Sequence, residues 1–118
     1  MNRVILIDRN DGSCRHGELS LLDSYDPQKH WLWLDLYDTN EAAHRELLEQ
    51  RFGIDSLAID DAMRSRHPPK YEALDNGVQF VVIRGLDENS SDIRFSNIQI
   101  SFFFNEAFLI TRHSDTSP

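Results

Sequence analysis

Two adjacent aspartates, Asp60 and Asp61, are the residues whose type and spacing point most directly to chemistry. They lie in a segment that we expect to be helical, where successive side chains point about 100° apart. Both carboxylates therefore cannot hold one ion from one face, and the pair predicts two separate contacts completed by groups elsewhere. Carboxylate oxygens suit hard cations such as Mg²⁺, which keeps several waters and needs few protein ligands. A solvated acidic helix face is the alternative.

The other candidate groups give no support for an enzyme. Cys14 follows a turn-forming run of polar residues and is expected to be a free surface thiol. No two of the five histidines have the i, i+4 spacing of a helical metal pair. Phosphate-binding glycine motifs and the serine-hydrolase motif do not occur. We therefore expect no catalytic activity.

Three cations, Arg64, Arg66 and Lys70, follow the acidic pair and surround His67-Pro68-Pro69. They could clamp an anion. They could equally neutralise the acidic helix before them and complement the negative end of its dipole, which is the commoner role of late-helix cations. The second interpretation is the one we expect.

Composition limits the class of protein. The chain has 118 residues, which fits one domain, and 40% of them are hydrophobic, which fits a globular core. It carries 12 basic and 20 acidic residues, a net charge of −8. Nucleic acid is an unsuitable partner, because phosphate binding needs a positive surface. The longest apolar runs are far shorter than the ~20 residues of a membrane helix.

Helix signals surround the acidic pair. Residues 38–40 are good N-caps for a helix that Gly53 should end, since glycine is favoured just past a helix C-terminus. Asp55 is placed to cap a second, shorter helix, which carries the two aspartates. This helix must end before Pro68, because the residue before a proline disfavours helix.

The rest of the chain is predicted to be strand and turn. The expected strands are residues 3–8, 19–22, 31–36, 70–74, 78–86, 93–104 and 107–112. We expect an α/β fold (mixed α+β): a mixed parallel and antiparallel sheet of about five to seven strands, with two or three helices on one face. Residues 31–36 and 98–104 are apolar on both sides, which predicts that more chain or a partner covers the other face. A partly wet apolar face is the alternative.

An ordered set of short motifs carries a family resemblance. It begins with Trp33-Leu34-Asp35-Leu36 and continues through Phe52-Gly53-Ile54-Asp55, Leu57 to Ala62, His67-Pro68-Pro69-Lys70-Tyr71-Glu72 and the strand from Phe80, ending in Ile98 to Phe104 and Leu109-Ile110-Thr111. In order and spacing, the set resembles the N-terminal cytoplasmic domain of CorA-like divalent-cation transporters. The resemblance covers about residues 31–112.

The resemblance implies a regulatory domain at residues 1–113 and a disordered tail at 114–118 that leads to a stalk helix and transmembrane region absent from this sequence. Family members are homopentamers of the cell inner membrane whose cytoplasmic domains respond to metal, and later helices cover the second face of the sheet. The resemblance also implies that the full-length protein transports Mg²⁺ or Co²⁺.

Site residues follow from the same resemblance. By position, Asp61 would be the main Mg²⁺-sensing carboxylate and Asp60 a secondary one, with Co²⁺ or Zn²⁺ as other ions and with weak binding in this domain alone. The resemblance implies structural roles for five further motif residues: Trp33, Asp35, Gly53, Pro69 and Lys70. Two alternatives remain open. One is the zinc-transporting branch of the superfamily, and the other is a soluble, metal-free protein–protein interaction module.

Overall fold

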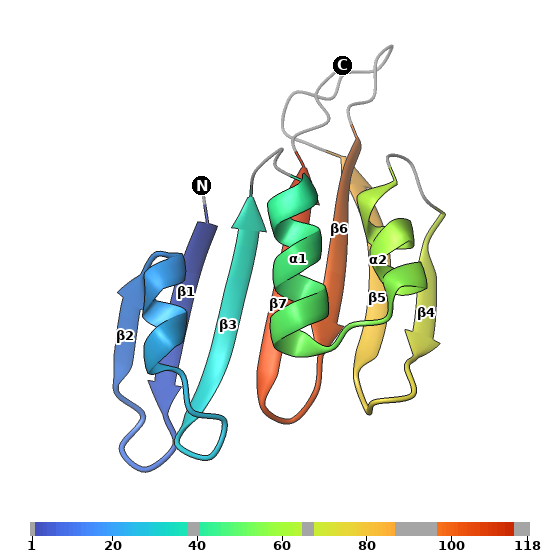
Figure 1. The fold of residues 1–118 in the computed structure, drawn as a ribbon. Coiled ribbons are helices and arrows are strands. Elements are labelled where there is room, and N and C mark those ends of the chain that lie inside the picture. Colours follow the sequence, from blue (N-terminus) through green and yellow to red (C-terminus); the bar gives the residue numbers. More distant parts are fainter. Residues whose placement is uncertain (1, 38–40, 65–67, 87–96, 115–118) are drawn as a thin grey trace.

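The fold is seen in a computed structural model, which describes residues 2–37, 41–64, 68–86 and 97–114. The described elements (Figure 1) are, in chain order, β1 (Asn2–Asp8), β2 (Cys14–Gly17), the 3₁₀ helix η1 (Leu19–Ser24), β3 (His30–Tyr37), α1 (Glu41–Phe52), α2 (Ser56–Met63), β4 (Lys70–Ala73), β5 (Gln79–Leu86), β6 (Asn97–Phe104) and β7 (Phe108–Ser114). The predicted caps at 38–40, the first residues of the strand predicted from 93, and tail residues 115–118 lie outside the described residues.

One mixed sheet organises the molecule. Within the described residues it has seven strands in the order β2-β1-β3-β7-β6-β5-β4. Of these described neighbours, β3 and β7 run parallel, with Leu34 opposite Ile110, and the other pairs are antiparallel. All three described helices lie on one side of the sheet (Figure 1). The predicted fold class and the helices on one face are confirmed.

The core lies between this helical layer and the sheet. Alternate residues of the central strands supply it, as the period of two in a strand requires. Leu34 on β3 and Ile110 on β7 are fully buried, and Phe80 and Phe103 stack with their ring centroids 4.7 Å apart. Burying such side chains contributes roughly 1.5–3 kcal/mol each, which makes this layer the main source of stability.

The connection between α1 and α2 follows the sequence signals closely. Gly53 follows α1 with φ +64°, a left-handed conformation that glycine adopts without strain. The Ile54 amide then returns to the Leu48 carbonyl at 3.0 Å, which satisfies a carbonyl at the helix end. Asp55 occupies the N-cap position of α2, although its side chain makes no capping hydrogen bond. The turn therefore sets where α2, with its aspartates, begins.

The predicted strand at residues 19–22 is wrong, because this segment is the 3₁₀ helix η1. Its amides close short local bonds, such as Leu21 to the Glu18 carbonyl and Tyr25 to the Leu22 carbonyl. This coiling buries Leu22 against the core. The structure instead has a strand just before this segment, the polar β2, which pairs with β1 on the side away from β3. The sequence did not predict β2, because this strand buries no large side chain.

The opposite side of the sheet, which we call the open face, is apolar and lacks a cover among the described residues. Trp31 and Trp33 remain 42% exposed and Ile83 43%. Other apolar side chains of this face are half-buried: Ile5, Ile7, Val81, Ile100, Phe102, Phe104 and Leu109. Large contiguous apolar surfaces of this kind mark interaction sites. Residues 31–36 were predicted to be buried on both sides of the sheet. In the described structure, only the side chains that face the helices are buried.

Candidate functional site

The acidic pair lies on α2, and its two carboxylates face different neighbours. Asp61 Oδ2 accepts from Lys70 Nζ on β4 at 2.5 Å. Asp60 Oδ1 accepts from Arg45 Nη2 on α1, also at 2.5 Å. The contacts are separate and each is completed by another element, in line with the angular spacing of adjacent helical residues. The pair therefore holds α2 to α1 on one side and to β4 on the other.

The Asp61 contact is the more enclosed of the two. The side chain of Asp61 is 20% exposed and that of Lys70 is 29% exposed. A second carboxylate approaches the same ammonium, since Glu72 Oε2 lies 3.9 Å from Lys70 Nζ. The hydrogen bond to Asp61 raises the pKa of Lys70 above its ordinary value of 10.5. One ammonium thus serves two carboxylates from neighbouring elements.

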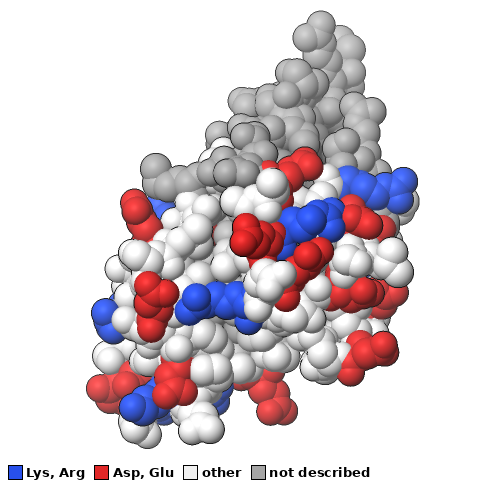
Figure 2. Space-filling view, in the orientation of Figure 1, with Lys and Arg blue, Asp and Glu red and all other residues white. Residues whose placement is uncertain are grey.

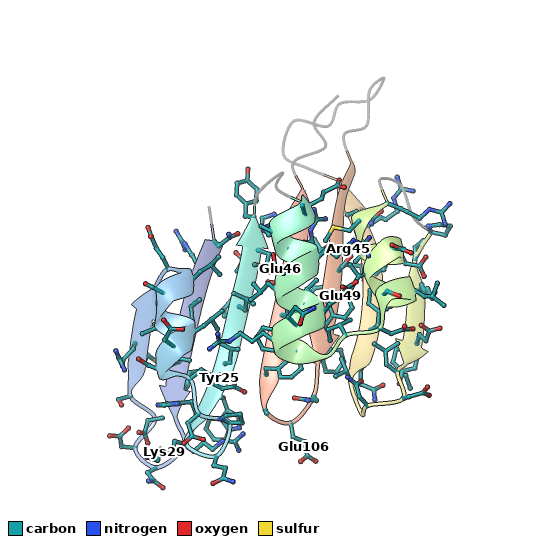
Figure 3. The ribbon with its side chains drawn as sticks, in the orientation of Figure 1. Tyr25, Lys29, Arg45, Glu46, Glu49 and Glu106 are labelled. Carbon is teal, nitrogen blue, oxygen red and sulfur yellow. The ribbon has the colours of Figure 1, made fainter. Side chains whose placement is uncertain are left out.

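The Asp60 contact repeats this arrangement at a more exposed place. Glu49, one turn after Arg45 on α1, brings Oε1 to 3.6 Å from Arg45 Nη1. Arg45 and Glu49 project from α1 toward α2 (Figure 3), and basic and acidic side chains lie next to one another over these helices (Figure 2). The hydrogen bond to Asp60 raises the pKa of the Arg45 guanidinium. A cation of the chain again lies between two carboxylates.

The donor chemistry of these pairs suits a hard cation. Within the described part of the chain, no group of three or more His, Cys, Asp or Glu side chains converges to form a metal site. Mg²⁺ is commonly bound through one or two carboxylates with waters in its other positions. Asp61 with Glu72, and Asp60 with Glu49, supply carboxylates of this chemical type, and in this structure each of these pairs lies around a cation of the chain itself.

The anion clamp considered for the cations after α2 lacks support. Lys70 is engaged with Asp61, as the alternative expects. Arg64 is exposed, and its backbone amide closes the end of α2 on the Asp60 carbonyl. Arg66 lies outside the described residues.

Trp33 and Asp35, assigned structural roles, belong to one hydrogen-bonded chain on the open face. Trp33 Nε1 donates to Thr111 Oγ1 at 3.1 Å, and the Thr111 hydroxyl donates to Asp35 Oδ1 at 2.8 Å. His113 Nε2 lies 3.3 Å from the same Asp35 oxygen and its ring packs on Tyr37. These side chains come from β3 and β7, the parallel pair. Trp33 and Asp35 on β3 are thus joined to Thr111 on β7, which lies 76 residues after Asp35 in the sequence, and this contact links the two halves of the sheet.

The remaining structural residues lie around α2. Asn76 Nδ2 donates to the Gly53 carbonyl at 3.0 Å, which links the α1–α2 turn to the turn before β5. Pro69 is exposed and immediately precedes Lys70, the first residue of β4. A proline there fits, since it lacks an N–H for a strand ladder.

A buried polar contact between His44 and Arg112 was not predicted. Arg112 on β7 is 4% exposed, and its Nε donates to His44 Nδ1 on α1 at 3.3 Å. Its Nη1 donates to the Ala62 carbonyl in the last turn of α2 at 3.4 Å. Burial lowers the pKa of Arg112. The alternation of Phe108, Ile110 and Arg112 was the available signal, because it places the arginine on the core side.

Comparison with known proteins gives the family. Residues 28–118 match the profile of the CorA-like Mg2+ transporter protein family. The chain belongs to this family. This match confirms the resemblance that the sequence motifs predicted. A separate comparison with curated protein sequences found no match. Within the described residues, no helix has the length and apolar character needed to cross a bilayer.

Two solved structures share the fold of this CorA-family domain. The structure of the full-length CmaX protein matches with a TM-score of 0.75 at 18% sequence identity, covering 97% of this chain and 34% of that one. The soluble domain of CorA from Methanocaldococcus jannaschii matches with a TM-score of 0.66 at 14% identity, covering 97% of this chain and 41% of that one. The chain therefore spans about a third to two-fifths of these proteins.

Proposed function

We propose that this chain is the metal-sensing, gating domain of a CorA-family Mg²⁺ or Co²⁺ transport protein. In this proposal residues 1–113 form the regulatory domain and the residues after them lead toward a membrane region. The whole protein is a homopentamer of the inner membrane with this domain in the cytoplasm. The observation that carries the proposal is the family match over residues 28–118, on a domain whose described residues leave one apolar face of the sheet uncovered.

Asp61 is the main sensing residue in this proposal, and Asp60 assists. Both lie on α2, on the helical side of the sheet, and each keeps part of its side chain in solvent. A divalent ion such as Mg²⁺, Co²⁺ or Zn²⁺ would bind carboxylate oxygens there and complete its shell with water or with a neighbouring subunit. Binding to one chain alone should be weak, on the order of millimolar, because few protein ligands are present.

Gating follows from linkage. Carboxylates of neighbouring subunits repel one another, and a bridging dication converts that repulsion into attraction. Ions that bind the closed assembly more tightly than the open one shift the population toward the closed state. Loss of the ion then favours opening. The open face of the sheet would be covered by later helices of the same protein.

The test uses Asp61→Lys in the intact pentamer, reconstituted in liposomes, with flux measured across a range of internal Mg²⁺. The lysine supplies a fixed positive charge, so closure should no longer depend on Mg²⁺. Glu46→Lys, which introduces the same charge on the exposed face of α1, is the matched control and should keep the Mg²⁺ response. An Asp61→Lys protein that still closes at high Mg²⁺ alone would refute the role of Asp61.

A second candidate function is a metal-free protein–protein interaction module. It is favoured by the open face together with the internal pairing of both aspartates, which leaves each carboxylate with a cation of its own chain. Light scattering of the 118-residue chain with and without Mg²⁺ separates the two. A change of assembly with Mg²⁺, absent in Asp61→Asn, supports sensing, whereas metal-independent assembly through the open face supports the module. The zinc-transporting branch is tested by repeating the flux assay with Zn²⁺.

A further inference from the structure

The positive charge of Arg112 on β7 has no acidic partner among the described residues. Its side chain is 4% exposed, and none of the ion pairs in the described part of the chain includes it. Glu41, the carboxylate whose charge acts on Arg112, lies exposed in the first turn of α1. An arginine stays protonated in proteins, so burial does not neutralise it. Because buried charges are normally paired, a counter-ion is expected beside this guanidinium.

Two groups of the chain contact the Arg112 guanidinium, and neither supplies a full negative charge. Nε donates to His44 Nδ1 on α1 at 3.3 Å, and Nη1 donates to the Ala62 carbonyl on α2 at 3.4 Å. A histidine that accepts at Nδ1 is neutral. The Ala62 carbonyl lies at the negative end of α2, whose dipole offsets about half a charge at most. Both bonds are longer than the usual length of about 2.9–3.0 Å, so the guanidinium keeps capacity for a further acceptor.

A second hydrogen-bond donor lies next to Arg112. Ser101 on β6 is directly opposite Arg112 in the register of the sheet, and it alternates with the core residue Phe103, so its side chain also points toward the helices. Opposite residues of antiparallel strands have their Cβ atoms about 4.5–5.5 Å apart. The Ser101 hydroxyl is buried, and no described group forms a hydrogen bond with it. Because such groups are rare in folded proteins, this hydroxyl calls for an acceptor.

We propose that Arg112 and Ser101 together bind a small inorganic anion, such as chloride, between the sheet and the helices α1 and α2. A guanidinium N–H and a serine O–H both donate to an anion, and hydrogen bonds that involve a charged group are the stronger ones. The anion balances the charge of Arg112 and accepts from Ser101. A buried water would satisfy Ser101 and leave the charge unbalanced. The proposal does not depend on the sensing role of Asp61.

A bound anion would strengthen the attachment of the helices to the sheet. Arg112 contacts both helices, and α1 lies over β7 (Figure 1). A ligand that binds the folded chain alone raises its stability by mass action, and the gain depends on concentration and on the dissociation constant. The stability of this domain should therefore rise with chloride when ionic strength is constant.

Thermal unfolding of the 118-residue chain tests the proposal, with chloride replacing gluconate, a much larger anion, at constant ionic strength. The wild-type midpoint should rise by about 4–8 °C at a chloride concentration tenfold above the dissociation constant. Ser101→Ala should require on the order of tenfold more chloride for the same rise, because one donor to the anion is lost. Arg112→Met removes the charge and should show no rise. Arg15→Met, on the exposed strand β2 at the far edge of the sheet, is the matched control and should respond like wild type.

The alternative results are distinct. A rise of the same size in Arg112→Met would identify a general salt effect and refute the site. A wild-type midpoint that does not change with chloride would refute it as well. A Ser101→Ala response equal to that of wild type would overturn the role of Ser101. These results leave the role of Asp61 untouched, because the Mg²⁺ measurements test that role separately.

A measurement on the unaltered chain covers the case in which Arg112→Met fails to fold. The Nε–H resonance of Arg112 and the amide resonance of Ser101 should shift as chloride replaces gluconate, with one common midpoint. The Nε–H resonance of Arg15 should stay constant. An Arg112 resonance that does not move over the whole titration, or that moves in parallel with Arg15, would overturn the proposal.

Discussion

Thr111→Val is the substitution that tests most directly how the two halves of the sheet are joined. Valine keeps the β-branched shape that suits a strand and removes the hydroxyl alone. That hydroxyl accepts from Trp33 Nε1 at 3.1 Å and donates to Asp35 Oδ1 at 2.8 Å. Both bonds are lost in one step, across the parallel β3–β7 pair.

The expected cost is about 1–2 kcal/mol in the free energy of unfolding. A neutral hydrogen bond contributes roughly 0.5–1.5 kcal/mol and one to a charged group about 1.5–3 kcal/mol. The gross loss is reduced because Trp33 and Asp35 are both partly exposed, so water can replace the missing hydroxyl. For a domain of this size the midpoint of thermal unfolding should fall by about 3–6 °C per kcal/mol.

Urea denaturation followed by tryptophan fluorescence measures the change, and the m-value should stay constant. Thr111→Ser is the control, since it retains the hydroxyl and loses one methyl group, worth about 0.8 kcal/mol. A double-mutant cycle with Trp33→Phe should give a coupling of about 0.5–1 kcal/mol. Zero coupling, or a Thr111→Val protein as stable as wild type, would refute the account of this hydrogen-bonded chain.

Three further outcomes are expected. Gly53→Ala should cost about 1–2 kcal/mol in thermal unfolding, from strain at φ +64° alone, because the new Cβ meets nothing closer than 4.0 Å; an unchanged midpoint would contradict this. Phe103→Ala should cost about 3–5 kcal/mol by urea denaturation, since the ring is fully buried; a cost below 1 kcal/mol would show that the core refills. Lys70→Met should lose up to about 1 kcal/mol at pH 7, and this difference from wild type should vanish as the pH rises past 10.5 through the raised pKa of Lys70, because the ammonium stabilises the fold only while protonated; a difference that persists at pH 12 would contradict the ion pair.

Local signals predicted most of the elements. The glycine after α1 and the prolines before β4 delimit the helices because their effects act within a few residues. The segment at 19–22 was wrongly predicted to be a strand, since two adjacent leucines fit a strand as well as a turn of helix. The polar strand β2 carries no hydrophobic pattern at all, and pairing with β1 is what makes it a strand.

The sequence predicted the two carboxylates of the candidate site, but it did not predict which basic side chains contact them. Asp60 and Asp61 are adjacent in sequence, so helical geometry alone separates their directions. Arg45 lies 15 residues before Asp60 and meets it through the packing of α1 on α2, which no local pattern encodes. Lys70 was named for its place in a motif, and the structure adds that its charge faces Asp61.

The position of β7 in the sheet has a consequence for biosynthesis. This strand is the last described one to emerge from a ribosome, yet it lies at the centre and pairs with both β3 and β6. Because protein synthesis adds ~5–20 residues per second, several seconds pass between the synthesis of β3 and that of β7. During this time one backbone edge of β3 is unpaired and could pair with another nascent chain. A polypeptide arrested shortly before Phe108 would present two half-sheets that cannot unite. We expect such arrested chains to be retained by chaperones.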